Sequence, residues 1–250
     1  MSCVVIDIGN TSTAVGLAGH GRISRVCHLH GGLKDPQAIK HVIRGLMAAD
    51  RVDGMALCSV VPAANTAWMR AIKQLTGRPP LVINHQLKLG VKIRYPRPAT
   101  IGADRLANAS GAMARYGCPA IVADFGTAVT FDILSQDGAY VGGVIAPGIP
   151  LMTQYLAEKT ALLPLIRLKG KCGTVGRSTE SAMKIGAKIG YRGMVREIVA
   201  HISEGLAMKK VALCATGGYA RWALEDIGMP FVIDPDLTLF GIARIFDLNV

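Results

Sequence analysis

The sequence has few aromatic residues and no concentrated basic segment. Phe, Trp and Tyr make up 5% of its 250 residues, and no run of Lys and Arg exceeds two, although the net charge is +11. Proteins that bind nucleic acids usually combine a basic patch or stripe with aromatic side chains that stack on bases. The charge therefore favours a protein that handles anionic small molecules, and nucleic acid is not an expected partner.

The sequence also lacks segments typical of membranes and secretion. No apolar stretch approaches the roughly 20 residues that a membrane helix needs. The N-terminal MSCVVIDIGN has no basic region, and its apolar run stops at Asp7, so no signal peptide is expected. The six Cys are scattered without a C-x-x-C pair, which favours reduced thiols, no zinc site and a cytoplasmic location.

The triplet DFG at residues 124–126 is well known from protein kinases, where its Asp holds Mg²⁺. A protein kinase should also contain a G-x-G-x-x-G-x-V loop, a V-A-I-K strand and an H-R-D-x-x-x-x-N loop. None of these is present. The triplet therefore needs another explanation.

An internal repeat explains the DFG triplet. VVIDIGNTSTAVGLA (4–18) and IVADFGTAVTFDILS (121–135) both give an apolar run, then Asp, an apolar residue, Gly and a nearby Thr. The two segments lie about half the chain apart, which indicates two similar domains rather than a solenoid. We predict an N-terminal domain over residues 1–116 and a C-terminal domain over residues 117–250.

Each repeat predicts a β-hairpin with a tight turn at Gly9 or Gly126. Glycine permits unusual backbone angles and a close approach by a ligand. Asp7 and Asp124 come at strand ends, where a carboxylate could hold a hydrated cation. Two such hairpins facing each other would clamp a polyphosphate and its metal. Plain hairpins with polar turns are the alternative, and the repetition favours the clamp.

A third segment, IRYPRPATIGADRL (93–106), leads into a predicted helix. Pro96 and Pro98 keep the chain extended, and the helix should end at Gly117. Asp104 and Arg105 then lie in the first helical turn, where free N–H groups favour anions. Arg105 could bind a carboxylate and Asp104 could accept a hydroxyl proton. Alternatively, Asp104 only caps the helix and Arg105 is solvated; the local sequence leaves both open.

Paired D-x-G-x-T hairpins followed by ATGG (215–218) resemble the actin, Hsp70 and sugar-kinase superfamily. The resemblance implies an α/β fold of two ribonuclease-H-like domains with an ATP cleft between them. It also implies that Gly217 and Gly218 lie against the adenosine. The alternative for this glycine pair is a strand-to-helix turn.

Within that superfamily the chain is similar to type III pantothenate kinase. DIGNT, IGADR, DFGTAVTFD, GGVIAPG (142–148) and DPDLTLFGI (234–242) carry the resemblance, which covers essentially the whole chain. It implies ATP-dependent phosphorylation of pantothenate, the first committed step towards coenzyme A. It further implies Mg²⁺ with ATP, a monovalent cation (K⁺ or NH₄⁺) and a homodimer.

The resemblance also implies residue roles. The catalytic base is Asp104, and the monovalent cation lies at Asp124. Asp7 lies near Mg²⁺ in the ATP phosphate loop, and Thr127 is a further ATP contact. The phosphate loop comprises Asp7, Ile8, Gly9, Asn10, Thr11, Ser12, Thr13 and Ala14. The pantothenate site comprises Tyr95, Gly102, Ala103, Asp104, Arg105 and Thr179.

The chain departs from the family's pattern near Thr179. Ser178 stands where the family often has Asn, and Met183 and Lys184 occur where it often has Gln. Two other functions are therefore weighed: a different small-molecule kinase or polyphosphate hydrolase on the same fold, and a regulatory, transcription-accessory protein. The family-like segment around Tyr95 argues against the first, and the basic charge is the only support for the second.

Residues 178–209 predict a long helix. Gly186, Gly190 and Gly193 share one of its faces, at a cost of about 1 kcal/mol each relative to Ala. A close helix crossing would explain these glycines, either at a homodimer contact or within the second domain.

Overall fold

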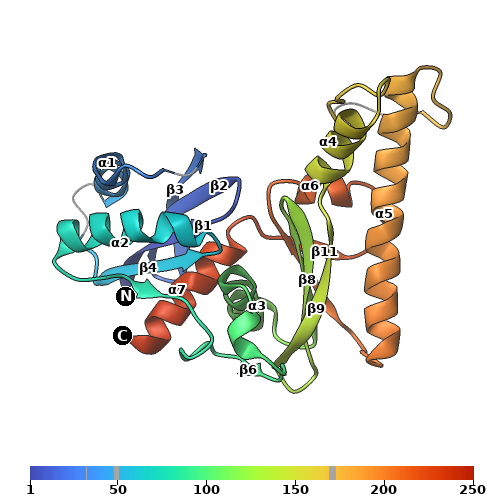
Figure 1. The fold of residues 1–250 in the computed structure, drawn as a ribbon. Coiled ribbons are helices and arrows are strands. Elements are labelled where there is room, and N and C mark those ends of the chain that lie inside the picture. The colour runs from blue at the N-terminus through green and yellow to red at the C-terminus, as the bar shows by residue number, and fades with distance from the viewer. Residues whose placement is uncertain (32, 48–50, 169–172) are drawn as a thin grey trace. The chain divides into compact units, whose positions relative to one another are not determined.

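The computed structural model describes residues 1–31, 33–47, 51–168 and 173–250, and it contains two β-sheets with helices (Figure 1). The first sheet has the order β3-β2-β1-β4-β5. Strand β1 pairs antiparallel with β2 and parallel with β4. Its strands are β1 (Ser2–Ile8), β2 (Ser12–Gly19), β3 (Arg22–His30), β4 (Gly54–Ser59) and β5 (Leu81–Val82).

The second sheet has the order β11-β10-β7-β8-β9-β6. Taken from β9 to β11, this order repeats that of the first sheet from β3 to β5, with β6 added beside β9. The internal repeat of the sequence is therefore also a repeat of topology. The strands are β6 (Lys92–Ile93), β7 (Ala120–Phe125), β8 (Ala128–Leu134), β9 (Ala139–Pro147), β10 (Ala212–Thr216) and β11 (Phe231–Ile233).

The described chain forms two compact units. The first contains residues 1–120, 132–142 and 236–250, and the second contains residues 121–131 and 143–235. The C-terminal helix therefore packs in the first unit, and the division passes along β8 and β9. The first unit's helices are α1 (Pro36–Met47), α2 (Pro62–Thr76), a 3₁₀ turn η1 (Pro98–Thr100), α3 (Ala103–Tyr116) and α7 (Leu237–Asn249). The second unit's are α4 (Ile149–Lys159), α5 (Thr179–Gly205) and α6 (Ala220–Leu224).

The core of the first unit follows from the apolar run of β1. Val4, Ile6 and Ile8 are buried on one side of the sheet, where Trp68 of α2 and Ile43 of α1 pack against the same cluster. At about 25 cal/mol per Å² of apolar area removed from water, such burial is the main force that holds the sheet and its helices together. It makes the first hairpin a rigid support for the polar turn that follows β1.

Two predicted helices are found in the structure. Helix α3 ends at Tyr116, and Gly117 follows it with a φ of +74°. Helix α5 starts at Thr179 as expected, but it ends at Gly205 rather than at residue 209. Ala207 and Lys210 take positive φ values of 48° and 52°, which are incompatible with a continuing right-handed helix.

A close helix crossing exists, but not where the glycine spacing of α5 predicted it. A Cβ atom added at Gly186, Gly190 or Gly193 would meet no atom of the described chain within 4 Å. The close crossing joins α3 and α7, which lie side by side in Figure 1. A Cβ at Gly241 would lie 1.8 Å from the Ala107 carbonyl oxygen. Packing within the second unit therefore does not explain the α5 glycines.

Cys3 and Cys214 are buried and free, Cys58 is buried, and Cys172 lies outside the described residues. None of the helices in the described ranges is long and apolar enough to cross a membrane.

Candidate active site

The first predicted hairpin is confirmed. β1 and β2 pair from Ser2–Gly19 to Ile8–Thr13, and the Gly9 N–H donates to the Ser12 carbonyl oxygen at 3.0 Å. Asn10 and Thr11 are exposed at the tip, whereas the side chains of Ile8 and Thr13 are buried. Within the predicted phosphate loop, these two residues are therefore almost closed to solvent. Asp7 lies half-buried near the end of β1.

The second predicted hairpin is also confirmed. β7 ends at Phe125, β8 begins at Ala128, and the Gly126 N–H donates to the Ala128 carbonyl oxygen at 3.0 Å. Thr127 is exposed at the tip, and Asp124 is half-buried on β7.

Two glycines pack tightly against this hairpin. A Cβ at Gly148 would lie 2.2 Å from the Thr127 carbonyl oxygen, and one at Gly217 would lie 2.6 Å from Oδ1 of Asp124. Gly217 has a φ of +90° and lies between β10 and α6, so the strand-to-helix turn expected for ATGG is present. Whether this turn contacts an adenosine stays a prediction. Gly217 thus lets the backbone lie against the Asp124 carboxylate, and Gly148 lets it lie against the carbonyl groups of the turn, where a side chain at either position would clash.

Asp104 is the second residue of α3, not its cap. Gly102 precedes the helix without a side-chain cap, and Oδ1 of Asp104 accepts the N–H of Arg105 at 2.8 Å. A Cβ at Gly102 would lie 2.5 Å from that oxygen, so only glycine leaves the carboxylate its place. Burial raises the pKa of Asp104 above the ordinary Asp value, against the opposing effect of the Arg105 N–H and guanidinium. A raised pKa suits a group that must accept a proton near neutral pH.

Arg105 is not solvated. Only 14% of its side chain is exposed, and its Nε donates to Oδ1 of Asp132 at 2.6 Å. Asp132 is fully buried on β8 and accepts a second hydrogen bond, from the Tyr140 hydroxyl at 3.0 Å. Burial raises the pKa of Asp132 to about 7, although Arg105 and Tyr140 both act to lower it. The alternative in which Arg105 points into water is therefore wrong.

Tyr95 lies against this buried group. Its ring meets that of Tyr140 edge-on, with 6.3 Å between the centroids, and it remains half-exposed. Gly142 lies beside the Tyr95 ring, since a Cβ there would be in ordinary van der Waals contact with it at 3.6 Å. Three of the predicted pantothenate-site residues, Tyr95, Asp104 and Arg105, thus lie in the same part of the first unit, around Asp132 and Tyr140.

A cavity of about 390 Å³ opens at the start of α3. Gly102 and Ala103 line it together with four polar residues that the sequence did not indicate: Ser59 at the end of β4, Asn84 and His85 after β5, and Thr100 of η1. Its volume is in the range of small-molecule sites. The cavity therefore places hydroxyl, amide and imidazole groups beside two predicted site residues.

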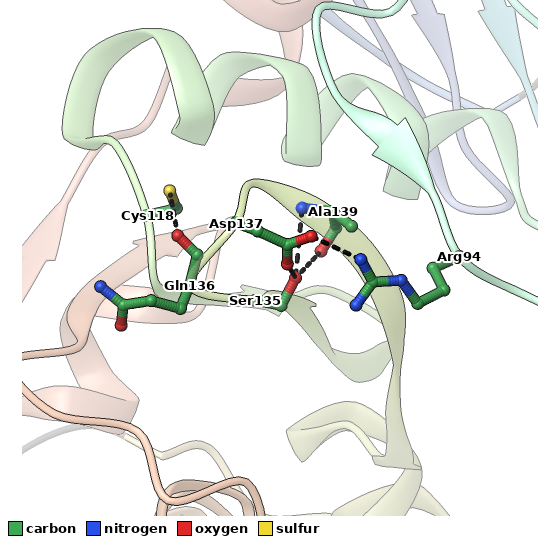
Figure 2. A network of polar contacts seen from close by, with 6 residues as sticks. All are labelled: Arg94, Cys118, Ser135, Gln136, Asp137 and Ala139. Carbon is green, nitrogen blue, oxygen red and sulfur yellow. Dashed lines mark hydrogen bonds and ion pairs between the residues drawn. The ribbon is translucent and has the colours of Figure 1, made fainter.

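Figure 2 shows a polar network that closes the turn between β8 and β9. The Ser135 hydroxyl donates to Asp137 at 2.7 Å and to the Ala139 carbonyl at 3.0 Å, and Arg94 pairs with Asp137. The hydrogen bonds from Ser135 and Arg94 lower the pKa of Asp137. The pair is largely exposed, so it contributes little to stability.

Thr179 is the first residue of α5 and is exposed. Ser178 caps this helix in a capping box, since its hydroxyl accepts the Ser181 N–H and the Ser181 hydroxyl accepts the Ser178 N–H. Ser178, the departure from the family's usual Asn, therefore fills a position where Ser and Asn cap equally well. The departure leaves the start of α5 and the position of Thr179 intact.

The carboxylate and backbone oxygen atoms at Asp7 and Asp124 suit hard cations, which prefer oxygen ligands. In the described ranges no group of three or more His, Cys, Asp or Glu residues could hold a metal ion together. Mg²⁺ that arrives with a nucleotide needs only one or two carboxylates besides phosphate oxygens, which Asp7 can supply. The place where Gly217 lies against Asp124 offers carboxylate and backbone oxygen atoms of the kind that K⁺ prefers.

Comparisons with known proteins identify the family. Residues 3–201 match the sequence pattern described as type III pantothenate kinase. The chain belongs to the type III pantothenate kinase family. One relative, the type III pantothenate kinase of Methylacidiphilum infernorum, is 41% identical over 248 residues, which cover 99% of this chain and 89% of the relative.

Solved structures agree with this family on the fold. A ROK-family glucokinase of Streptomyces griseus matches this fold with a TM-score of 0.53 at 14% identity. The match covers 100% of this chain and 99% of the glucokinase. A Campylobacter jejuni protein assigned to the Baf family of transcriptional activators has a TM-score of 0.62 at 18% identity, with 98% and 97% coverage. At such identities the likeness shows the sugar-kinase type of fold alone, so the latter name gives the transcription-accessory alternative no support.

The sequence-based prediction missed Asp132 and Tyr140. A signal for Asp132 was present, because a single carboxylate stands in the apolar strand segment VTFDIL. A charge at a buried strand position is costly and therefore needs a partner. The partner itself, Arg105, lies 27 positions away in the chain and could not be assigned without the structure.

Proposed function

We infer that the protein transfers the γ-phosphoryl group of ATP to pantothenate, giving 4′-phosphopantothenate in the first step of coenzyme A biosynthesis. Membership in the type III pantothenate kinase family supports this activity. The observation that carries it is the start of α3, where Asp104 with a raised pKa adjoins an Arg105 held by a buried carboxylate. This arrangement presents a base and an anion-binding group side by side.

In the proposed reaction, Asp104 orients the primary hydroxyl of pantothenate and accepts its proton as the phosphoryl group is transferred. Arg105 binds the pantothenate carboxylate or the amide end, and Tyr95 lines the same site with its exposed ring edge. Thr179, with Gly102 and Ala103, completes the substrate contacts. Phosphoryl transfer depends mainly on positioning and charge neutralisation, so no covalent enzyme intermediate is needed.

The two hairpins are proposed to bind the ATP phosphates, with backbone N–H groups of the turn after Asp7 and with the hydroxyl of Thr127. Mg²⁺ near Asp7 and K⁺ or NH₄⁺ at Asp124 would neutralise phosphate charge. Exposed polar tips at Asn10, Thr11 and Thr127 support this assignment. Gly217 supports the place of the monovalent cation, because its lack of a side chain lets the backbone approach the Asp124 carboxylate closely.

The first experiment measures ADP release from MgATP, with and without pantothenate, in K⁺ and in Na⁺ at equal ionic strength. We expect turnover only when pantothenate and K⁺ are both present. Asp124→Asn should remove most of the difference between K⁺ and Na⁺ while the protein remains folded. A folded protein that binds ATP but shows no pantothenate-dependent turnover would contradict the proposed function. Equal rates in K⁺ and Na⁺ would contradict only the cation role.

We also propose a homodimer in which α5 of one chain contacts α5 of another. Gly186, Ile189 and Gly190 are exposed on one face, and Ile189 retains 60% of its surface. Among residues 1–31, 33–47, 51–168 and 173–250, no atom lies within 4 Å of a Cβ at the two glycines. A second copy could approach this face closely, which would explain the glycines that one chain leaves without a packing role.

Ile189→Arg should convert the dimer to a monomer, because it places a charge in the middle of the proposed contact. Sedimentation velocity of the wild type and the variant would measure this. Leu206→Arg, at an apolar position that is 50% exposed beyond the end of α5, is the matched control and should leave the mass unchanged. A wild-type monomer at micromolar concentration would contradict the proposal.

We also propose a cytoplasmic location and a domain boundary. A cytoplasmic location fits the use of ATP and the buried free thiols of Cys3 and Cys214. The domain boundary at residues 116 and 117 falls at the end of α3, but α7 packs in the first unit, so the test compares residues 1–116 alone with residues 1–116 joined to α7; the boundary holds only if the shorter segment folds by itself.

A further inference from the structure

Among the buried polar residues in the described part of the first unit, Asp132 is the one with a carboxylate. Its side chain is 0% exposed and lies on β8 between the buried residues Phe131 and Ile133. Removing an ion from water costs several kcal/mol, and replacing a buried ion pair by apolar residues often stabilises a protein. Stability alone therefore does not account for an ion pair at this position.

The geometry of the pair leaves part of Arg105 available. Asp132 contacts Nε, on the side of the guanidinium group, through Oδ1 at 2.6 Å. It does not form the two-pronged contact through which Arg commonly binds a carboxylate. In the described chain, Nη2 of Arg105 and Oδ2 of Asp132 are buried and have no hydrogen-bond partner. Unpaired buried polar atoms cost free energy, which a bound polar group can recover.

Asp132 is also connected to Tyr95 through one intermediate ring. Tyr140 donates its hydroxyl to Asp132 at 3.0 Å, the Tyr95 ring packs edge-on against Tyr140, and the Arg105 guanidinium lies 5.9 Å from the Tyr140 centroid. Tyr140 is 0% exposed, so its orientation is fixed by packing. One carboxylate thus holds both side chains that flank the proposed pantothenate position.

We propose that Asp132 is a positioning residue for pantothenate: it holds Arg105 by Nε so that the Nη groups face the substrate, and through Tyr140 it fixes Tyr95. This inference rests on the proposed kinase function. Asp132 touches neither substrate, so its effect on the reaction passes through Arg105 and Tyr140. The groups that face it are Arg105 and Asp104 from α3 and Tyr140 from β9.

The test is a double-mutant cycle on steady-state kinetics. Asp132→Asn keeps the shape of the side chain and an oxygen that can accept from Nε, but it removes the charge. We expect the KM for pantothenate to rise about tenfold or more, with the KM for ATP within about twofold of the wild type. In an Arg105→Lys background the same change should add less than about twofold, since its target is already gone. Asp137→Asn, in the exposed turn pair of the same unit, is the matched control and should keep wild-type values.

Tyr140→Phe keeps the ring and removes only the hydroxyl, so it tests the proposal even if Asp132→Asn folds poorly. It should raise the KM for pantothenate by about two- to fivefold and leave that for ATP unchanged. Unchanged KM for pantothenate in both variants, or additive effects in the cycle, would overturn the positioning role while the kinase function stands. Equal increases in both KM values would also overturn it. If the wild type itself shows no pantothenate-dependent turnover, the proposed function fails and this inference fails with it.

Discussion

Asp104→Asn is expected to lower kcat by about 10²–10⁴-fold, because the amide cannot accept the proton of the pantothenate hydroxyl. The fold should survive, since an Asn oxygen can still accept the N–H of Arg105 that Asp104 accepts at 2.8 Å. The KM for ATP should change little, because Asp104 is assigned to the acceptor. Turnover by coupled ADP release and unfolding by circular dichroism measure the two halves of this expectation.

The pH dependence gives the same prediction a second readout. A base acts only when it is deprotonated, and burial raises the pKa of Asp104. The decline of kcat/KM for pantothenate on the acid side should therefore occur above the ordinary titration range of Asp, near 3.9. In Asp104→Asn the residual rate should lose this dependence on Asp104. A folded Asp104→Asn protein with near-normal turnover would remove Asp104 from the role of base.

Gly241→Ala is expected to lower the free energy of unfolding by about 3 kcal/mol, because it overpacks the crossing of α3 and α7. The added Cβ would lie 1.8 Å from the Ala107 carbonyl oxygen, which is a backbone atom and cannot rotate away. The helices would have to separate, and the buried hydrogen bond from Thr238 to Asn108 at 2.8 Å would be strained with them. Urea unfolding followed by circular dichroism measures the change.

Gly45→Ala is the matched control for this substitution. Gly45 is exposed in α1 of the same unit, and a Cβ there would meet no atom of the described residues within 4 Å. Ala is the better helix former, so the control should be stabilised by up to about 1 kcal/mol. Equal effects of the two substitutions would show that α3 and α7 do not approach each other as closely as the structure has them.

The crossing of α3 and α7 also bears on the active site. Helix α3 carries Asp104 and Arg105 in its first turn, and Gly111 in its middle approaches Leu237 of α7, since a Cβ at Gly111 would lie 2.8 Å from the Leu237 carbonyl oxygen. A partly unfolding Gly241→Ala protein should therefore lose kinase activity together with stability. Chain segments more than a hundred positions apart thus fix the place of the proposed base.

Local chemistry explains what the sequence determined by itself. The two hairpins, the end of α3 at Gly117 and the start of α5 at Thr179 follow from strand periodicity, glycine turns and a serine cap, all of which act over a few neighbouring residues. The internal repeat predicted two similar halves, and the strand order of the two sheets repeats accordingly. Motifs in the order DIGNT, IGADR and DFGTAVTFD indicated the family to which the chain belongs.

Only the tertiary structure decided which groups meet across distant segments. The sequence left open whether Arg105 is solvated. The structure shows that Arg105 pairs with the buried carboxylate of Asp132 on β8. Such an ion pair depends on how the strand and the helix pack together, and spacing along the chain does not reveal it. The glycines of α5 suggested a close helix crossing, yet the close crossing in the described chain joins α3 and α7 at Gly111 and Gly241. A glycine permits a close approach, but its position in the sequence does not specify which helix approaches. The sequence determined the elements and the family, and long-range packing determined the partners of each functional side chain.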